Sequence, residues 1–193
     1  MVQKEQVVSS RDNILAKIKA IPMEQKPLPE IPDFELKLEL IELFIQSIKG
    51  NKGEVIDQKQ LREFLEINRF TKIIDLSKNF PDLGTLELVK DPHDLADLEV
   101  AIIKGQFGVA ENGGIWLTDD NMGLRALPFI TEHLVIVLEE KSLVSNMHTA
   151  YQKIGNQHSG FGLFLAGPSK TADIEQSLVI GAHGAKSLRV VFI

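Results

Sequence analysis

Helical periodicity of apolar side chains dominates the first third of the chain. Either Ser9 or Ser10 can cap a first helix. The apolar residues of this helix share one face and are Ile14, Leu15, Ile18 and Ile21. Two further amphipathic helices are expected from Asp33 to Gly50 and from Gln58 to Ile67. The pattern therefore predicts a largely helical N-terminal part.

Prolines separate the first helix from the rest of the chain. They are Pro22, Pro27, Pro29 and Pro32. Because proline disfavours helix at the preceding residue, we expect an extended arm here. We therefore divide the chain into residues 1–33, a helix with a Pro-rich arm, and residues 34–193, one α/β domain. The helix of the arm is also a candidate contact in an oligomer.

Short apolar runs predict the strands, and helical segments separate most of them. The expected strands are Val55-Ile56, Ile73-Ile74, Thr85 to Val89, Val100 to Ile103, Leu134 to Leu138, Phe161 to Ala166 and Leu188 to Ile193. The later helices are Asp91 to Leu98, Leu143 to Ile154 and Thr171 to His183. Strands that alternate with helices predict an α/β domain with a mainly parallel central sheet flanked by helices, as in Rossmann-like folds.

One β-hairpin is also expected. Residues 108–111 and 115–118 have strand character and flank Asn112-Gly113-Gly114. Asn-Gly favours a turn with positive φ between antiparallel strands. The turn would place the carboxylate of Glu111 at the mouth of the sheet, where α/β proteins commonly bind ligands.

The stretch from Gly167 to Gly184 joins the run at 161–166 to the helix expected from Thr171. Thr171 is a candidate N-cap and Asp173 falls in the first turn. Unpaired backbone N–H groups, with the hydroxyl groups of Ser169 and Thr171 and the ammonium of Lys170, would bind a carboxylate or phosphate. The alternative is a well-capped turn without a ligand. Pro168 stands where the lysine of a P-loop would follow, and no G-x-G-x-x-G occurs.

Composition narrows the classes of function. The chain of 193 residues carries a net charge of -6, which argues against generic binding of nucleic acid or anionic membranes. It contains no cysteine, so it has no thiolate ligand for an iron–sulfur cluster. Its histidines lack the spacing of a zinc site. The sequence shows neither a signal peptide nor an apolar run long enough for a membrane span, which predicts a cytoplasmic protein.

The segment GPSKTADIEQ, the later GAHG and the final SLRVVFI resemble the closing signature of the lactate-utilisation protein C family, the LUD domain. The resemblance is clearest from about Leu98 onward. It implies the fold superfamily of the coenzyme A transferases and a part in the oxidation of L-lactate to pyruvate. Iron–sulfur clusters are then expected only in partner subunits, and this chain would be the component without a cofactor.

The resemblance also brings candidate site residues. Ala110-Glu111-Asn112-Gly113 is similar to the catalytic Ser-Glu-Asn-Gly of one class of coenzyme A transferases, in which the glutamate is acylated, although Ala110 replaces the serine. A plain hairpin explains the same residues. Arg125 precedes Pro128 in a region where the family typically has an arginine before a proline, and it would bind a carboxylate or form a surface salt bridge.

His183 either caps the predicted helix or lies beside another loop of the site. It cannot act with Asp173 within one helix, because ten residues span about 15 Å. Two hypotheses follow. The first is a ligand-binding subunit of a lactate-oxidising system, and the second is an acyl or coenzyme A transferase. The candidate nucleophile is Glu111, and the candidate ligand-binding residues are Asn112, Arg125, Gly167, Ser169, Thr171, Asp173 and His183.

Overall fold

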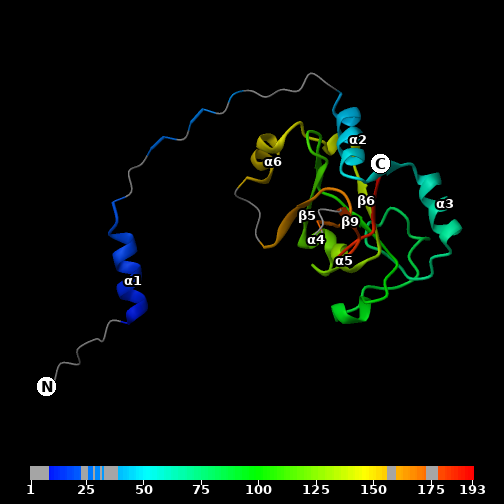
Figure 1. The fold of residues 1–193 in the computed structure, drawn as a ribbon, viewed down its shortest axis with the longest axis horizontal. Helices are drawn as coiled ribbons and strands as arrows, with labels where there is room; N and C mark the ends of the chain where they lie inside the picture. Colours follow the sequence, from blue (N-terminus) through cyan, green and yellow to red (C-terminus); the bar gives the residue numbers. More distant parts are fainter. Residues whose placement is uncertain are drawn as a thin grey trace. The chain divides into compact units, whose positions relative to one another are not determined.

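The computed structural model describes residues 9–22, 26–27, 29–30, 32, 39–155, 160–172 and 178–193. The chain divides into two units, Met1–Asp33 and Phe34–Ile193 (Figure 1). In the first unit, helix α1 (Ser10–Lys19) begins after Ser9, whose hydroxyl accepts the Asp12 backbone N–H. The predicted helix and its cap are therefore confirmed. The predicted apolar face is largely exposed to solvent, as at Ile14 and Ile18, each 58 % exposed.

A five-stranded sheet forms the centre of the second unit. Its strands pair in the order β1-β10-β6-β3-β2, and all four pairings are parallel. The bounds are β1 (Glu54–Ile56), β2 (Ile73–Asp75), β3 (Val100–Lys104), β6 (His133–Leu138) and β10 (Ser187–Phe192). The predicted α/β class with a parallel central sheet is confirmed.

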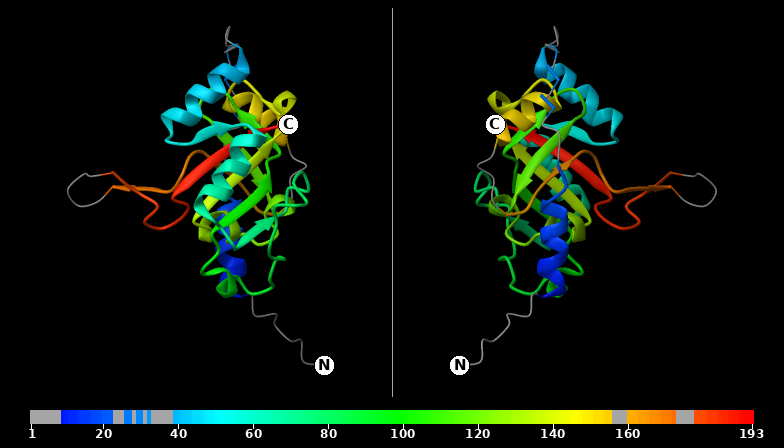
Figure 2. Two further views of the ribbon diagram at one scale, coloured as in Figure 1. Left: turned by 90° about the vertical axis from the view of Figure 1, so that its right-hand side faces the viewer. Right: turned by 90° about the vertical axis from the view of Figure 1, so that its left-hand side faces the viewer.

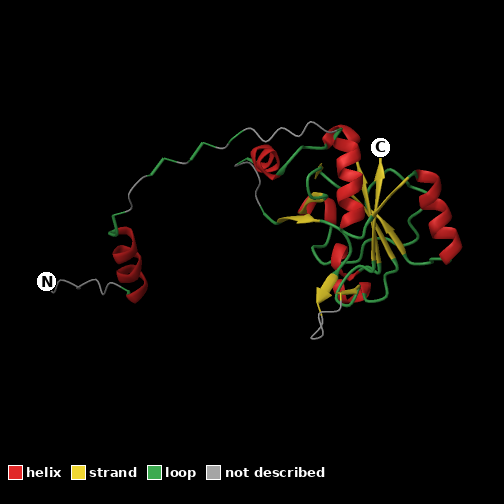
Figure 3. Ribbon diagram, turned by 45° about the horizontal axis from the view of Figure 1, so that its top comes forward, coloured by secondary structure: helices red, strands yellow, loops and turns green. Residues whose placement is uncertain are grey.

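Helices cover both faces of this sheet (Figure 3). Helix α2 (Leu40–Gly50) packs Phe44 and Ile48 on one face, and α3 (Gln58–Asn68) packs Leu61 and Leu65 on the other. Successive residues of each inner strand point to opposite faces, so both faces of the sheet are buried. Helix α2 was predicted from Asp33 but begins at Leu40, after the N-cap residue Glu39. Residues 33–38 lie outside the described part of the chain.

A second, antiparallel sheet lies on the α2 side of the central sheet. Its strands are β4 (Phe107–Val109), β5 (Gly114–Thr118) and β7 (Gly162–Leu165), in the order β4-β5-β7. The predicted hairpin is confirmed as β4–β5. Strand β7 lies at an edge and its residues are only half-buried. The strand predicted at 161–166 is therefore confirmed, but it pairs with the hairpin and does not enter the parallel sheet, and it is less buried than its apolar sequence suggests.

Three connections differ from the prediction. Thr85 to Val89 forms no strand, and the backbone N–H groups of Thr85 and Leu86 instead donate to the Ile73 carbonyl oxygen. The segment 91–98 contains a short 3-10 helix, η1 (Pro92–Leu95). The helix expected from Leu143 begins later, as α6 (Met147–Ile154), because the Asn146 side chain caps it by accepting the Thr149 N–H. The remaining short helices are α4 (Asp119–Met122), α5 (Leu127–Ile130) and η2 (Glu140–Ser142).

The helix predicted from Thr171 to His183 is wrong. The segment instead contains the antiparallel strands β8 (Lys170–Ala172) and β9 (Leu178–Ile180), which project from the body of the domain (Figure 2). The β-branched Val179 and Ile180 favour a strand, and Gly181 has a φ of 77°, which ends regular structure. Thr171 therefore lies in a strand and is not an N-cap. Asp173 lies outside the described residues.

Candidate functional site

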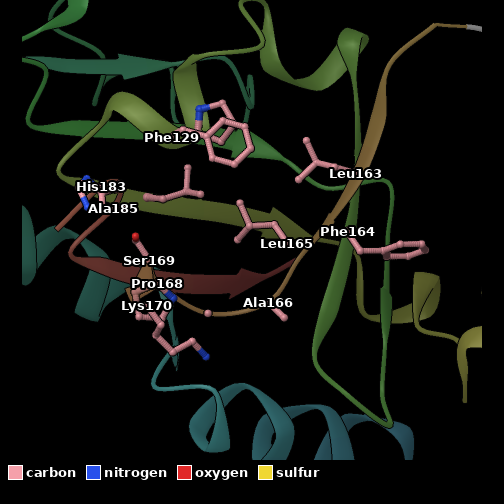
Figure 4. A pocket seen from close by; sticks show the side chains of 14 residues that line it. Phe129, Leu163, Phe164, Leu165, Ala166, Pro168, Ser169, Lys170, His183 and Ala185 are labelled. Carbon is pink, nitrogen blue, oxygen red and sulfur yellow. The ribbon is translucent and has the colours of Figure 1, made fainter. Parts of the chain in front are cut away.

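A cavity of about 330 Å³ lies where the Gly167 loop meets the segment after β9 (Figure 4). Its volume is at the lower end of the range for small-molecule sites. Four parts of the domain form it: α5, the start of β6, β7 with the following loop, and the loop before β10. The lining residues are Pro128, Phe129, Leu134, Leu163, Phe164, Leu165, Ala166, Gly167, Pro168, Ser169, Lys170, His183, Gly184 and Ala185.

One side of the cavity is apolar. Leu163 and Leu165 point to the same side of β7, and Phe164 points to the other side (Figure 4). This alternation follows from the period of two in a β-strand. Phe129 is 46 % exposed and contributes an aromatic ring to the cavity, whereas Leu134 is buried. A ligand would therefore find hydrocarbon on this side.

The other side is polar and carries positive charge. Ser169, Lys170 and the exposed His183 line this side. The Lys170 side chain extends away from Leu163 and Leu165 (Figure 4), and its Nζ donates to the Asn51 oxygen. Among the described residues that line the cavity, none has a carboxylate side chain. The Ser169 backbone is held in place, because its N–H donates to the Ala185 oxygen at 2.9 Å and its oxygen accepts the Gly181 N–H at 3.0 Å. This arrangement favours an anionic group over a cationic one.

Gly167 allows a close approach of two backbone segments. Its φ is 79°, and a Cβ at this position would lie 2.3 Å from the Asn51 carbonyl oxygen. The same oxygen accepts a hydrogen bond from Lys170 Nζ at 3.0 Å. The Asn51 side chain donates to the Asn112 carbonyl oxygen at 2.7 Å. Asn51, at the C-cap of α2, therefore connects the cavity loop to the β4–β5 turn, and sequence reasoning missed it because only its position after Gly50 distinguishes it.

Glu111 lies in the β4–β5 turn and supports helix α6. Its Oε1 accepts the Met147 backbone N–H at 2.7 Å, at the first residue of that helix. A carboxylate at this end offsets the positive end of the helix dipole. The Asn112 side chain accepts the Gly114 N–H at 2.8 Å within the same turn. Of the two residues expected at positive φ, only Gly113 has it, at 71°.

Arg125 forms the salt bridge that the sequence left as one of two alternatives. Its Nε and Nη2 donate to the two carboxylate oxygens of Asp119 at 2.7 and 2.9 Å. These hydrogen bonds raise the pKa of Arg125 above its ordinary value. The guanidinium also lies over the Phe161 ring, 5.1 Å from its centroid. The Phe161 backbone N–H donates to the same Asp119 carboxylate. Arg125 therefore lies near the start of β7, whereas Gly167 follows the end of that strand.

The candidate residues thus fall into separate places. Gly167, Ser169 and His183 line the cavity together. The cavity lining does not include Glu111, Asn112, Arg125 or Thr171. Lys170, whose ammonium was also expected as a donor at the Gly167 loop, lines the cavity with Gly167, Ser169 and His183.

The described residues form neither a metal-binding cluster nor a membrane-spanning helix. Among the residues that the structure describes, no group of three or more histidine or acidic side chains is arranged to hold a metal ion. Within the same described ranges, no helix has the length and apolar character needed to cross a membrane.

Comparison with known proteins points to one family. Lactate utilization protein C of Bacillus pumilus is 31 % identical over 99 residues, covering 48 % of this chain and 40 % of that protein. The protein of the same name from Shouchella clausii is 33 % identical over 92 residues, covering 45 % and 40 %. The matched segment therefore spans about 40 % of the length of these relatives. A solved DUF162 family protein from Deinococcus radiodurans has the same fold, with a TM-score of 0.58 and 16 % identity, over 79 % of this chain and 95 % of that chain.

The family pattern described as the LUD domain matches residues 91–193. Every described residue that lines the cavity falls in this range. Because the match covers more than half of the 193 residues, and the curated relatives are lactate utilization proteins, this chain belongs to the LUD domain family, which includes the lactate utilization protein C chains.

Proposed function

We propose that this chain is the ligand-binding component of a system that oxidises L-lactate to pyruvate, and that its ligand site is the cavity beside Gly167. The observation that carries the proposal is that the segment matching the LUD domain, residues 91–193, builds the whole described lining of this cavity, and that lactate utilization proteins are among the relatives of the chain. Ser169, Lys170 and His183 supply hydrogen-bond donors and positive charge for a carboxylate.

Electron transfer is assigned to iron–sulfur partner subunits. The 193 residues contain no cysteine, so the chain has no thiolates with which to bind such a cluster. In this proposal the chain holds the small carboxylate while its partners accept the electrons. Its cytoplasmic location, and an oligomer contact through α1, stay predictions.

Reconstitution of lactate oxidation tests the proposal. The chain is expected to co-purify with iron–sulfur subunits that are encoded with it, and lactate oxidation by the purified partners is expected to require its addition. Full activity of the partners in its absence would refute the proposal. A binding-deficient variant, Lys170→Met, should co-purify but restore less activity, whereas Lys59→Met, on the exposed face of α3, should restore it fully.

No observation favours the alternative of an acyl or coenzyme A transferase. Its nucleophile would be Glu111, whose carboxylate accepts the Met147 N–H and lies outside the described lining of the cavity. Incubation of the chain with acyl-CoA, followed by trapping with hydroxylamine, tests this alternative directly. Modification of Glu111 would support a transferase and an unmodified Glu111 would count against it.

A further inference from the structure

We infer that the cavity beside Gly167 prefers a 2-hydroxy or 2-oxo monocarboxylate whose apolar side chain is larger than the methyl group of lactate. This inference rests on the proposed function, because it assigns the ligand class of the same cavity. It follows from the size of the cavity and from the division of its lining into an apolar and a cationic side.

The cavity is too large for lactate alone. The six non-hydrogen atoms of lactate, at no more than roughly 30 Å³ each, occupy at most roughly 180 Å³. The cavity measures about 330 Å³. With lactate bound at the polar side, the remaining volume would hold water against hydrocarbon, which is unfavourable. A ligand with about three to six further carbon atoms would fill it.

The position of the apolar side chains shows where that extra hydrocarbon would lie. Leu163 and Leu165 point from β7 into the cavity, and Phe129 borders it from α5 (Figure 4). All three are at least partly exposed to solvent, so their apolar surface is available to a ligand. Apolar surface of this kind stabilises a bound methylene by about 0.8 kcal/mol when burial is complete, or roughly fourfold in Kd.

The polar side fixes the head group. An ammonium has three donors, and Lys170 Nζ uses one of them on the Asn51 oxygen, so Lys170 can also donate to a carboxylate. Ser169 adds a hydroxyl beside it. Since the described lining contains a lysine and a histidine but no carboxylate, an anionic head group is favoured there. Inorganic phosphate would satisfy this side but would leave the leucine and phenylalanine side chains in contact with water.

A series of 2-hydroxy acids tests the inference. Dissociation constants of the full chain would be measured by titration calorimetry or NMR for lactate, 2-hydroxybutanoate, 2-hydroxy-4-methylpentanoate and 3-phenyllactate, with inorganic phosphate as the anion control. We expect Kd to fall about two- to fourfold per buried methylene, and about tenfold or more from lactate to 2-hydroxy-4-methylpentanoate. Equal affinities across the series, or tightest binding of lactate or phosphate, would overturn the inference.

Two variants separate the contributions of the two sides. Phe129→Ala should reduce the preference for the longer acids, because it removes apolar contact at a position that is already 46 % exposed and so should not prevent folding. Lys170→Met should weaken all the acids by a similar factor. The surface control Lys59→Met should change neither. An unchanged preference in Phe129→Ala would contradict the assigned wall.

The outcome is distinguishable from failure of the proposed function. If lactate binds most tightly and the chain is required for lactate oxidation, the preference inferred here is wrong and the proposed function stands. If the partner subunits oxidise lactate fully without the chain, the proposed function is wrong whatever the order of affinities.

Discussion

At the scale of single residues, Glu111 illustrates how a candidate nucleophile acquires a structural explanation. Its carboxylate accepts the Met147 N–H at 2.7 Å and caps the N-terminus of α6. Glu111→Ala is therefore expected to lower the free energy of unfolding by about 1 kcal/mol, the usual cost of losing a cap. Urea denaturation measures this, and Glu66→Ala on the exposed face of α3 is the control, expected to stay within about 0.5 kcal/mol. An effect of Glu111→Ala no larger than the control would contradict the capping role.

Replacing either of two glycines by alanine should change the stability of the domain, in opposite directions. Gly167→Ala should destabilise the domain, because the new Cβ would lie 2.3 Å from the Asn51 oxygen and the φ of 79° disfavours a side chain. Gly50→Ala should stabilise it by roughly 0.5–1 kcal/mol, because Gly50 is the last residue of α2 and a Cβ added there would meet no atom within 4 Å. Melting temperatures of the two variants test the pair. A stable Gly167→Ala variant would refute the contact with Asn51.

His133 lies in a polar cluster at the start of β6. Its ring packs against Phe64 and Phe70, with centroids 5.5 and 5.0 Å away. Its Nδ1 is 2.8 Å from the Ser187 hydroxyl, which accepts a hydrogen bond from Arg189 at 2.6 Å. Because the hydroxyl oxygen accepts from Arg189, its proton is free to be donated to Nδ1, and this favours the neutral imidazole. Burial, and after it the charge of Arg189, lower the pKa of His133.

This lowered pKa predicts a loss of stability in acid. The folded chain binds a proton at His133 less readily than the unfolded chain, so the stability is fully present above the ordinary histidine pKa of about 6.5 and is lost as the pH falls below it. The free energy of unfolding at pH 7.5 and pH 5 would be compared for the wild type and for His133→Gln. The variant should lose less stability over this interval. An equal loss in both proteins would contradict the assignment.

At the scale of elements, the projecting hairpin is the main difference between the sequence-based expectation and the structure. Thr171 pairs directly with Val179 in the β8–β9 register. Directly opposed strand residues have Cα atoms about 4.5–5.5 Å apart, within the range of a disulfide. In the helix that the periodicity favoured, the same two residues would be about 12 Å apart, which is too far.

A cysteine pair therefore distinguishes hairpin from helix. The chain has no native cysteine, so the double variant Thr171→Cys with Val179→Cys contains only the two introduced thiols. We expect an intramolecular disulfide on mild oxidation, detected as the loss of two free thiols per monomer by mass spectrometry. Each single variant serves as a control that cannot form this bond within one chain. Retention of both thiols in the double variant would contradict the hairpin register.

At the scale of the whole molecule, the parallel sheet was the part most accessible from sequence. Val100 to Ile103 and Leu134 to Leu138 are uninterrupted apolar runs because both faces of these strands are covered by other parts of the domain. The run at 161–166 looks similar but forms an edge strand, and apolar composition alone does not distinguish the two environments. The segment from Thr171 was misassigned because Ile174, Leu178 and Gly181 happen to follow helical spacing.

The cavity was only partly accessible from sequence. Gly167 and Ser169 are near each other in sequence. His183 lines the same cavity because strands β8 and β9 pair and bring the chain after β9 back beside the Gly167 loop. Spacing contained no information on Asn51, whose contacts with Gly167 and Lys170 depend on how α2 packs. Glu111 was chosen from the hairpin turn and from family resemblance, and Arg125 from its planar guanidinium and the same resemblance. Both have local partners, at Met147 and Asp119, and are absent from the described lining.

The central claim is that the cavity beside Gly167 serves lactate oxidation, and blocking it tests this claim most directly. Leu165 points from β7 into the cavity (Figure 4), so Leu165→Trp should fill part of it. The measurement is the rate of lactate oxidation by iron–sulfur partner subunits when wild-type chain, Leu165→Trp or the control Gly50→Ala is added, each checked for folding by circular dichroism. The account predicts restoration by the wild type and by Gly50→Ala, and at least a tenfold lower rate with folded Leu165→Trp. An equal rate with the blocked variant would contradict it.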